Sequence, residues 1–140
     1  MNFLLDTNVV SEWTRPRPEP RVVAWLADVD EDRVFLSVVT LAELQHGIEI
    51  LPVDSKRKRL LAWLDEDLLE RFESRIIDVT PAVARDWGAV RVLAQRAGKP
   101  IGAMDAFFAA TARVRGLTLV TRNDSDYKAV GVELLNPWSG

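Results

Sequence analysis

The sequence predicts an α/β fold in which a parallel sheet of about five strands is covered by helices on both faces. Short apolar runs, which fit buried strands, alternate along the chain with longer segments whose apolar residues recur every three or four positions, as in amphipathic helices. Prolines and glycines lie where these helices must end. The 140 residues, 48% of them hydrophobic, suffice for one core, so we expect a single domain over residues 1–140.

The first third of the chain predicts two strands and three helices. An apolar run at residues 3–5 ends at Asp6, as expected for a strand that passes into a helix. That helix is brief, because three prolines between residues 16 and 20 favour extended backbone. A helix over residues 22–29, a strand over 33–37 and a helix from about 39 to 51 follow. The buried stripe of this last helix is Leu41, Leu44, Ile48 and Leu51.

The remaining elements follow the same alternation. Ser55 begins a helix whose inward-facing residues are Leu60, Leu61, Leu64, Leu68 and Phe72. A strand over residues 75–79 precedes a helix from about 81 to Gly98 and another over 104–115, which ends before Gly116. The second of these helices should bury Phe107, Ala110 and Val114. Strands over residues 117–120 and 132–135 complete the sheet.

Composition limits the classes of function. The chain has no cysteine and one histidine, so a bound metal must be held mainly by oxygen ligands, which favours Mg²⁺ or Mn²⁺. No apolar run is long enough to span a bilayer, and Asp6 interrupts the N-terminal apolar run too early for a signal peptide, so we expect a cytoplasmic protein without a membrane segment. The net charge of -3 argues mildly against a nucleic-acid partner, unless bound cations restore positive charge at an acidic cluster.

Acidic and amide side chains gather at the predicted carboxyl ends of the strands, the edge at which parallel sheets bind ligands. Asp6 follows the first strand, and Asn123, Asp124 and Asp126 follow the fourth. Glu43 and Asp105 fall in the opening turns of helices that can face the same edge. Because clustered carboxylates repel one another unless cations neutralise them, the set predicts a divalent-metal site, whose natural chemistry is phosphodiester hydrolysis.

Each of these residues also has a local explanation. Asp6 can cap the helix that follows it, and Glu43 can complete a capping box with Thr40. Asp105 can complement a helix dipole, and the aspartates after the fourth strand can belong to a polar turn. His46 lies three residues after Glu43, but a lone histidine is more often a surface or packing residue than a ligand. The Arg and Lys side chains clustered at residues 15–21 and 56–59 form either solvated basic faces or contacts for a nucleic-acid backbone.

Four short motifs in a fixed order resemble those of PIN-domain proteins. They are LLDTN at residues 4–8, LAEL at 41–44 with Gly47, MDA at 104–106 and VTRN at 120–123. The segments GKPI at 98–101, DY at 126–127 and NPW at 136–138 are similar to the VapC and FitB branch of toxin–antitoxin PIN proteins. No single motif is specific, but the ordered set covers nearly the whole chain.

The resemblance implies a Mg²⁺- or Mn²⁺-dependent endoribonuclease. By motif, Asp6 and Asp105 bind the metal and Glu43 completes an acidic triad, with Asp126 as a further catalytic residue. Asn123 stands where many family members carry aspartate, so either Asp124 or Asp126 is expected to compensate. Thr121 is a candidate for positioning phosphate or water.

The resemblance also implies partners: structured RNA as substrate, a second copy in a homodimer, and a VapB-like antitoxin that contacts operator DNA. One alternative is a catalytically weak PIN module that acts mainly as a DNA-bound regulator together with its antitoxin. A phosphotransfer receiver is disfavoured, because it needs an aspartate after the middle strand and a lysine after the last one. Residues 79–81 and 133–137 supply neither.

Overall fold

The computed structural model describes residues 1–139 and contains a five-stranded parallel sheet. The strands, in spatial order, are β3 (Ile76–Ile77), β2 (Val34–Ser37), β1 (Phe3–Leu5), β4 (Thr118–Val120) and β5 (Leu134–Leu135). Central β1 aligns Phe3 with Val34 of β2 and with Thr118 of β4. The predicted α/β class and parallel sheet are therefore confirmed, although β3 and β5 are shorter than the sequence suggests.

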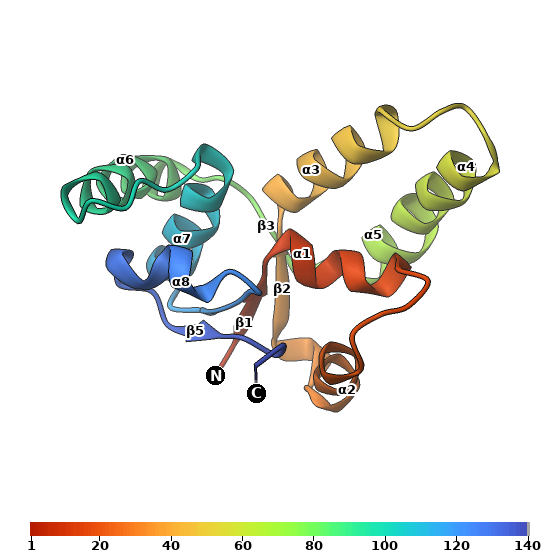
Figure 1. Ribbon diagram of the computed structural model, residues 1–140, viewed down its shortest axis with the longest axis horizontal. Coiled ribbons are helices and arrows are strands. Elements are labelled where there is room, and N and C mark those ends of the chain that lie inside the picture. Colours follow the sequence, from red (N-terminus) through yellow and green to blue (C-terminus); the bar gives the residue numbers. More distant parts are fainter. Residues whose placement is uncertain (140) are drawn as a thin grey trace.

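Helices cover both faces of the sheet (Figure 1). On one side lie α6 (Pro81–Arg96), α7 (Ala103–Arg115) and α8 (Asp124–Tyr127), the last followed by the 3₁₀ turn η4 (Lys128–Val130). On the other lie α1 (Thr7–Val10), η1 (Ser11–Thr14), α2 (Pro20–Asp28), α3 (Val38–Glu49), α4 (Ser55–Ala62), the π-helical η3 (Trp63–Leu68) and α5 (Leu69–Arg71). The short η2 (Glu31–Arg33) leads into β2.

The two layers bury separate apolar clusters, and β1 divides them. Leu4 belongs to the cluster under α6 and α7, whereas Leu5 belongs to the cluster that also contains Val9, Leu64 and Phe72. This division follows from the strand geometry, because successive side chains point to opposite faces of a sheet. Leu4 and Leu5 are both fully buried, so the backbone that leads into Asp6 is fixed from both faces of the sheet.

Side chains with local roles set the helix boundaries. Asp54 caps α4 by accepting hydrogen bonds from the amides of Lys56 and Arg57, and Thr80 caps α6 through Val83 N. Gly116, at a φ of 65°, ends α7 in the left-handed conformation that glycine adopts without a Cβ clash.

Several expectations on individual residues were wrong. Val114 is 40% exposed rather than buried, because it lies on the outer face of α7. Asp124 and Asp126 belong to the short helix α8 and not to an irregular turn. Of the stripe expected for this helix only Ile48 is buried; Leu41 and Leu44 are half-buried, and so is Leu51, which lies beyond the end of α3 at Glu49. Among residues 1–139, no helix combines the length and apolar character needed to cross a membrane.

Candidate active site

Asp6 lies at the carboxyl end of the central strand, with only 5% of its surface exposed. Its amide donates to Val120 O at 2.9 Å, which extends the pairing of β1 with β4 by one residue. Asp6 Oδ2 accepts hydrogen bonds from Thr121 Oγ1 at 2.8 Å and from the Tyr127 hydroxyl at 3.1 Å. Asp6 stands at the N-cap position of α1, but within residues 1–139 its side chain makes no capping hydrogen bond. The capping explanation of Asp6 was therefore wrong.

Burial and a neighbouring carboxylate change the protonation of this site. Burial raises the pKa of Asp6 from 3.8 to about 6, and the charge of Asp105 adds to this rise, although the hydrogen bonds from Thr121 and Tyr127 partly offset it. Burial is also the main cause that raises the pKa of Asp105, to which the charge of Asp126 contributes. Asp6 and Asp105 therefore face one environment in which two negative charges are unfavourable without a cation.

Tyr127 is a component of the site that the sequence did not reveal. Its side chain is fully buried, and its hydroxyl contacts Asp6 and interacts with Asp105. Burial and these two carboxylates raise the pKa of Tyr127, so the phenol stays protonated and acts as a hydrogen-bond donor. The available sequence signal was the Asp126-Tyr127 pair, which does not show that the hydroxyl turns back to the first strand.

Glu43 reaches the site through the residue that follows Asp6. Thr7 Oγ1 donates to Glu43 Oε1 at 2.7 Å, and it lies 3.2 Å from Thr40 Oγ1. The helix that carries Glu43 is capped by Ser37, whose hydroxyl accepts from Val39 N, so the predicted capping box of Thr40 and Glu43 was wrong. Glu43 is half-buried and free of a capping role, which leaves its charge available at the edge of the sheet.

Comparison with known proteins assigns this arrangement to a family. The PIN domain model matches residues 3–133. Toxin FitB of Neisseria gonorrhoeae is 41% identical over 97% of this chain and 98% of its own. The tRNA(fMet)-specific endonuclease VapC of Shigella flexneri is 33% identical over 99% of each chain.

The solved structure of FitAB bound to the IR36 DNA fragment superimposes with a TM-score of 0.93, at 38% identity, over 97% of this chain and 95% of that one. The chain belongs to the PIN-domain family, in its VapC/FitB group. Proteins of this family that act as nucleases generally depend on a divalent metal. The expected fold and the expected family are both confirmed.

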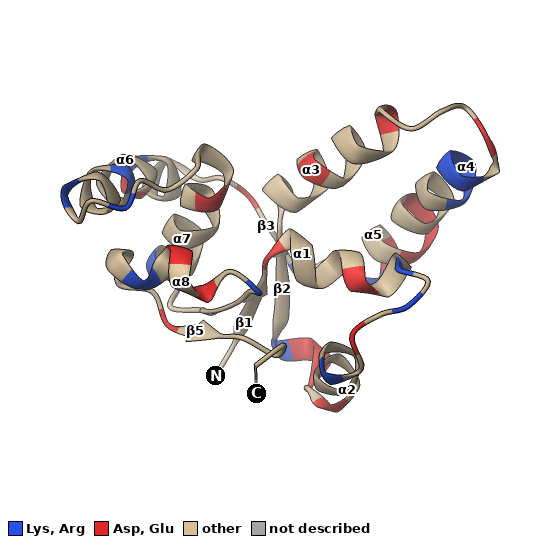
Figure 2. Ribbon diagram, viewed as in Figure 1, with Lys and Arg blue, Asp and Glu red and all other residues tan. Residues whose placement is uncertain are grey.

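Acidic segments from several elements of this PIN domain lie around the carboxyl edge of its sheet, at the end of β1 and on α3, α7 and α8 (Figure 2). Within residues 1–139, no three acidic or histidine side chains are arranged to hold one metal ion. The pair of Asp6 and Asp105 still fits Mg²⁺, because this ion is usually bound through one or two carboxylates and keeps several waters. The hydrogen bonds on Asp6 Oδ2 and the raised pKa values of both aspartates agree with such a ligand pair.

The residues around the fourth family position of this PIN domain separate into different roles. Asn123 is exposed, and its amide donates to Thr121 Oγ1 at 3.1 Å. Asp124 Oδ1 accepts from Asn136 Nδ2 at 3.2 Å, which ties α8 to the chain after β5. Asp126 is exposed, and its Oδ1 lies 3.9 Å from Lys99 Nζ. The charge of Asp126 also contributes to the raised pKa of Asp105. Asp126 is therefore better placed than Asp124 to act at the site.

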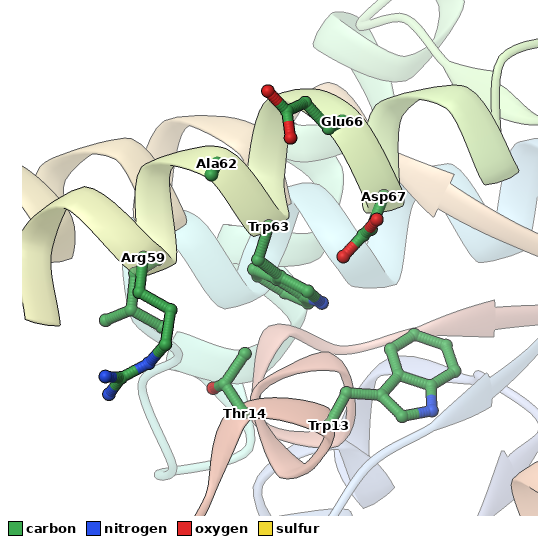
Figure 3. Close-up of a pocket in the computed structure, with 8 residues that line it drawn as sticks. Trp13, Thr14, Arg59, Ala62, Trp63, Glu66 and Asp67 are labelled. Atoms are coloured by element: carbon green, nitrogen blue, oxygen red, sulfur yellow. The ribbon is translucent and has the colours of Figure 1, made fainter.

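A separate hollow of about 430 Å³ lies between η1 and the α4–η3 helix (Figure 3). Trp63 and Arg59 extend from the helix toward Thr14 of η1, while Glu66 and Asp67 line its other end. Its lining contains none of the acidic residues at the sheet edge. His46 is exposed near the end of α3, and within residues 1–139 it belongs to no group of side chains that could hold a metal ion.

Proposed function

We propose that this protein is a cytoplasmic Mg²⁺- or Mn²⁺-dependent endoribonuclease, the toxin of a type II toxin–antitoxin pair, and that it hydrolyses phosphodiester bonds in structured RNA. One PIN domain over residues 1–140 would carry the whole activity. The observation that carries the proposal is the pairing of Asp6 with Asp105 at the carboxyl edge of the sheet. Burial raises the pKa of both carboxyls, and a neighbouring carboxylate adds to each rise, Asp105 for Asp6 and Asp126 for Asp105. Such a pair needs a cation, and a cation there attracts a phosphodiester.

Each residue of the site has a definite task in this proposal. Asp6 and Asp105 hold the ion, Glu43 contributes charge from α3 to a second ion or orients water, and Asp126 contributes charge from α8. When bound, the metal supplies Lewis-acid activation of water and stabilises the leaving oxygen. Thr7 orients Glu43 through its 2.7 Å hydrogen bond, and Thr121 holds Asp6 in the same way at 2.8 Å. No side-chain nucleophile is required.

The partners follow from the relatives. One relative is named a toxin, another a tRNA-specific endonuclease, and the FitAB structure contains DNA. We therefore propose that this chain binds a VapB-like antitoxin and contacts operator DNA through that antitoxin. The homodimer is proposed on the family resemblance alone. A net charge of -3 agrees with DNA contact by the partner rather than by this chain.

The test is cleavage of total small RNA by purified protein freed of antitoxin, with Mg²⁺ or Mn²⁺, beside Asp105→Asn prepared identically. Asp105→Asn changes one carboxylate to an amide of the same shape, so the variant controls for contaminating nuclease. We expect metal-dependent cutting at discrete sites that disappears in the variant and in EDTA.

Equal cutting by both proteins would overturn the assignment of Asp105. If neither folded protein cuts any RNA, the alternative is favoured, in which the PIN module acts with its antitoxin as a DNA-bound regulator. Binding of the antitoxin complex to operator DNA, measured with both proteins, then becomes the decisive experiment.

A further inference from the structure

Two hydroxyl groups hold the same oxygen of Asp6. Thr121, directly after β4, donates to Oδ2 at 2.8 Å, and Tyr127, at the end of α8, donates to it at 3.1 Å. Within residues 1–139, Oδ1 accepts no side-chain hydrogen bond. The two hydrogen bonds on Oδ2 therefore restrict rotation of the carboxylate, which also interacts with the backbone of Thr7, and among the described residues they leave Oδ1 without a side-chain donor.

The two donors are themselves fixed. Thr121 is fully buried, and its Oγ1 accepts a hydrogen bond from Asn123 N at 3.1 Å, which directs the hydroxyl proton toward Asp6. Tyr127 is fully buried in the cluster under α6 and α7, with Val130 and Leu119 in the same cluster. Its ring therefore cannot swing away without opening the core, and the position of its hydroxyl is set by packing.

We propose that Tyr127 is a positioning residue for the metal: its hydroxyl, together with that of Thr121, occupies Asp6 Oδ2 and leaves Oδ1 as the oxygen that binds the ion. This inference rests on the proposed metal-dependent function. Hydrogen bonds to a ligating carboxylate orient it, and losing such a partner typically lowers metal affinity about 10- to 100-fold.

The experiment measures Mn²⁺ affinity by calorimetric titration of the purified full chain without RNA. Tyr127→Phe removes only the hydroxyl oxygen and keeps the ring in the core. We expect its affinity for Mn²⁺ to fall about 10- to 100-fold below that of the wild type. Thr121→Val should also weaken binding, and Thr121→Ser, which keeps a hydroxyl, should retain more affinity than Thr121→Val.

Thr111→Val is the matched control. Thr111 is buried in α7 and donates to Phe107 O at 2.7 Å, so this variant removes a buried hydroxyl without touching Asp6. Thermal unfolding of each variant in EDTA shows whether it is folded. The proposal expects Thr111→Val to bind Mn²⁺ as the wild type does.

The outcomes separate the inference from the function on which it rests. A folded Tyr127→Phe protein that binds Mn²⁺ as tightly as the wild type overturns the inference alone. An equal loss of affinity in Thr111→Val also overturns it, because the effect would then be one of general stability. If Tyr127→Phe does not fold, unchanged affinity in Thr121→Val has the same meaning. A wild type that binds no Mn²⁺ overturns the proposed function, and the inference falls with it.

Discussion

Thr7 Oγ1 donates a hydrogen bond of 2.7 Å to Glu43 Oε1, and thereby joins the residue after Asp6 to the middle of α3. The two residues are 36 positions apart in the sequence. Through this bond α1 and α3, which follow neighbouring strands β1 and β2, present their polar groups to the same edge of the sheet. The charge of Glu43 is thus tied to the position of Asp6 without direct contact between the two carboxylates.

Removing the charge of Glu43 should impair cleavage and spare the fold. Glu43→Gln keeps an oxygen that accepts from Thr7 but removes the negative charge, so we expect cleavage to slow at least about tenfold, while the free energy of unfolding changes by less than about 0.5 kcal/mol. Initial rates of RNA cleavage and urea unfolding measure the two effects.

The control for this change is Glu49→Gln, an exposed position on the same helix whose side chain pairs with Arg57. It should cleave RNA as the wild type does. Slow cleavage by Glu49→Gln, or normal cleavage by Glu43→Gln, would show that Glu43 has no specific role.

The stability of the metal-free protein should decrease as pH rises through about 6. The folded pKa of Asp6 is raised from 3.8 to about 6, so folding favours the protonated form. The stabilisation is complete below about pH 4 and is lost as pH passes 6, a change of about 3 kcal/mol. Asp105 acts in the same direction. Urea unfolding in EDTA measures the effect, and Mn²⁺ affinity should rise over the same pH range because the metal needs ionised carboxylates.

Asp6→Asn isolates this effect. The difference in unfolding free energy between Asp6→Asn and the wild type should grow in favour of the variant between about pH 4 and pH 7, because the variant has no charge to bury. Exposed Asp65→Asn should follow the wild-type curve instead. A constant difference between Asp6→Asn and the wild type would mean that Asp6 ionises normally in the folded protein.

The sequence could predict those site residues whose position follows from a strand end. Asp6 ends an apolar run, and the carboxyl edge of a parallel sheet is a general place for ligands, so its location needed no tertiary information. Asp105 could be predicted because Gly116 and the apolar period define its helix. The role of Tyr127 could not be predicted, since it depends on where α8 packs. A hydrogen bond between residues 121 positions apart leaves no local pattern in the sequence.

The π-helical segment Trp63–Leu68 was also missed, for a geometric reason. Leu60, Leu64, Leu68 and Phe72 recur every four residues, and in a regular α-helix this spacing drifts by about 40° at each step. A π-helix winds more widely, with bonds from i to i+5, and so cancels much of that drift. Leu64, Leu68 and Phe72 are consequently all buried on one face, a compensation that reading the sequence as an α-helix cannot include.

Replacement of two glycines by alanine should change the free energy of unfolding in opposite directions. Gly88 lies inside α6 with open space where a Cβ would stand, so Gly88→Ala should raise the free energy of unfolding by about 0.5–1 kcal/mol. Gly116 also has open space, but its φ of 65° strains any L side chain, so Gly116→Ala should lower it by about 1–2 kcal/mol. Urea unfolding of both variants tests this, and stabilisation by Gly116→Ala would contradict the left-handed end of α7.

The variants Asp124→Ala and Asp126→Ala should show which of the two aspartates supplies the fourth acidic residue of the active site. Asp124 accepts from Asn136 Nδ2 and from Ser125 N, so its loss should lower the free energy of unfolding by about 1–3 kcal/mol and leave cleavage near normal in the folded protein. Asp126 is exposed and acts on Asp105 through its charge, so its loss should slow cleavage with little change in unfolding. Cleavage rates and urea unfolding of the two variants, measured together, make the comparison. The reverse pattern would place Asp124 in the active site and make Asp126 a surface residue paired with Lys99.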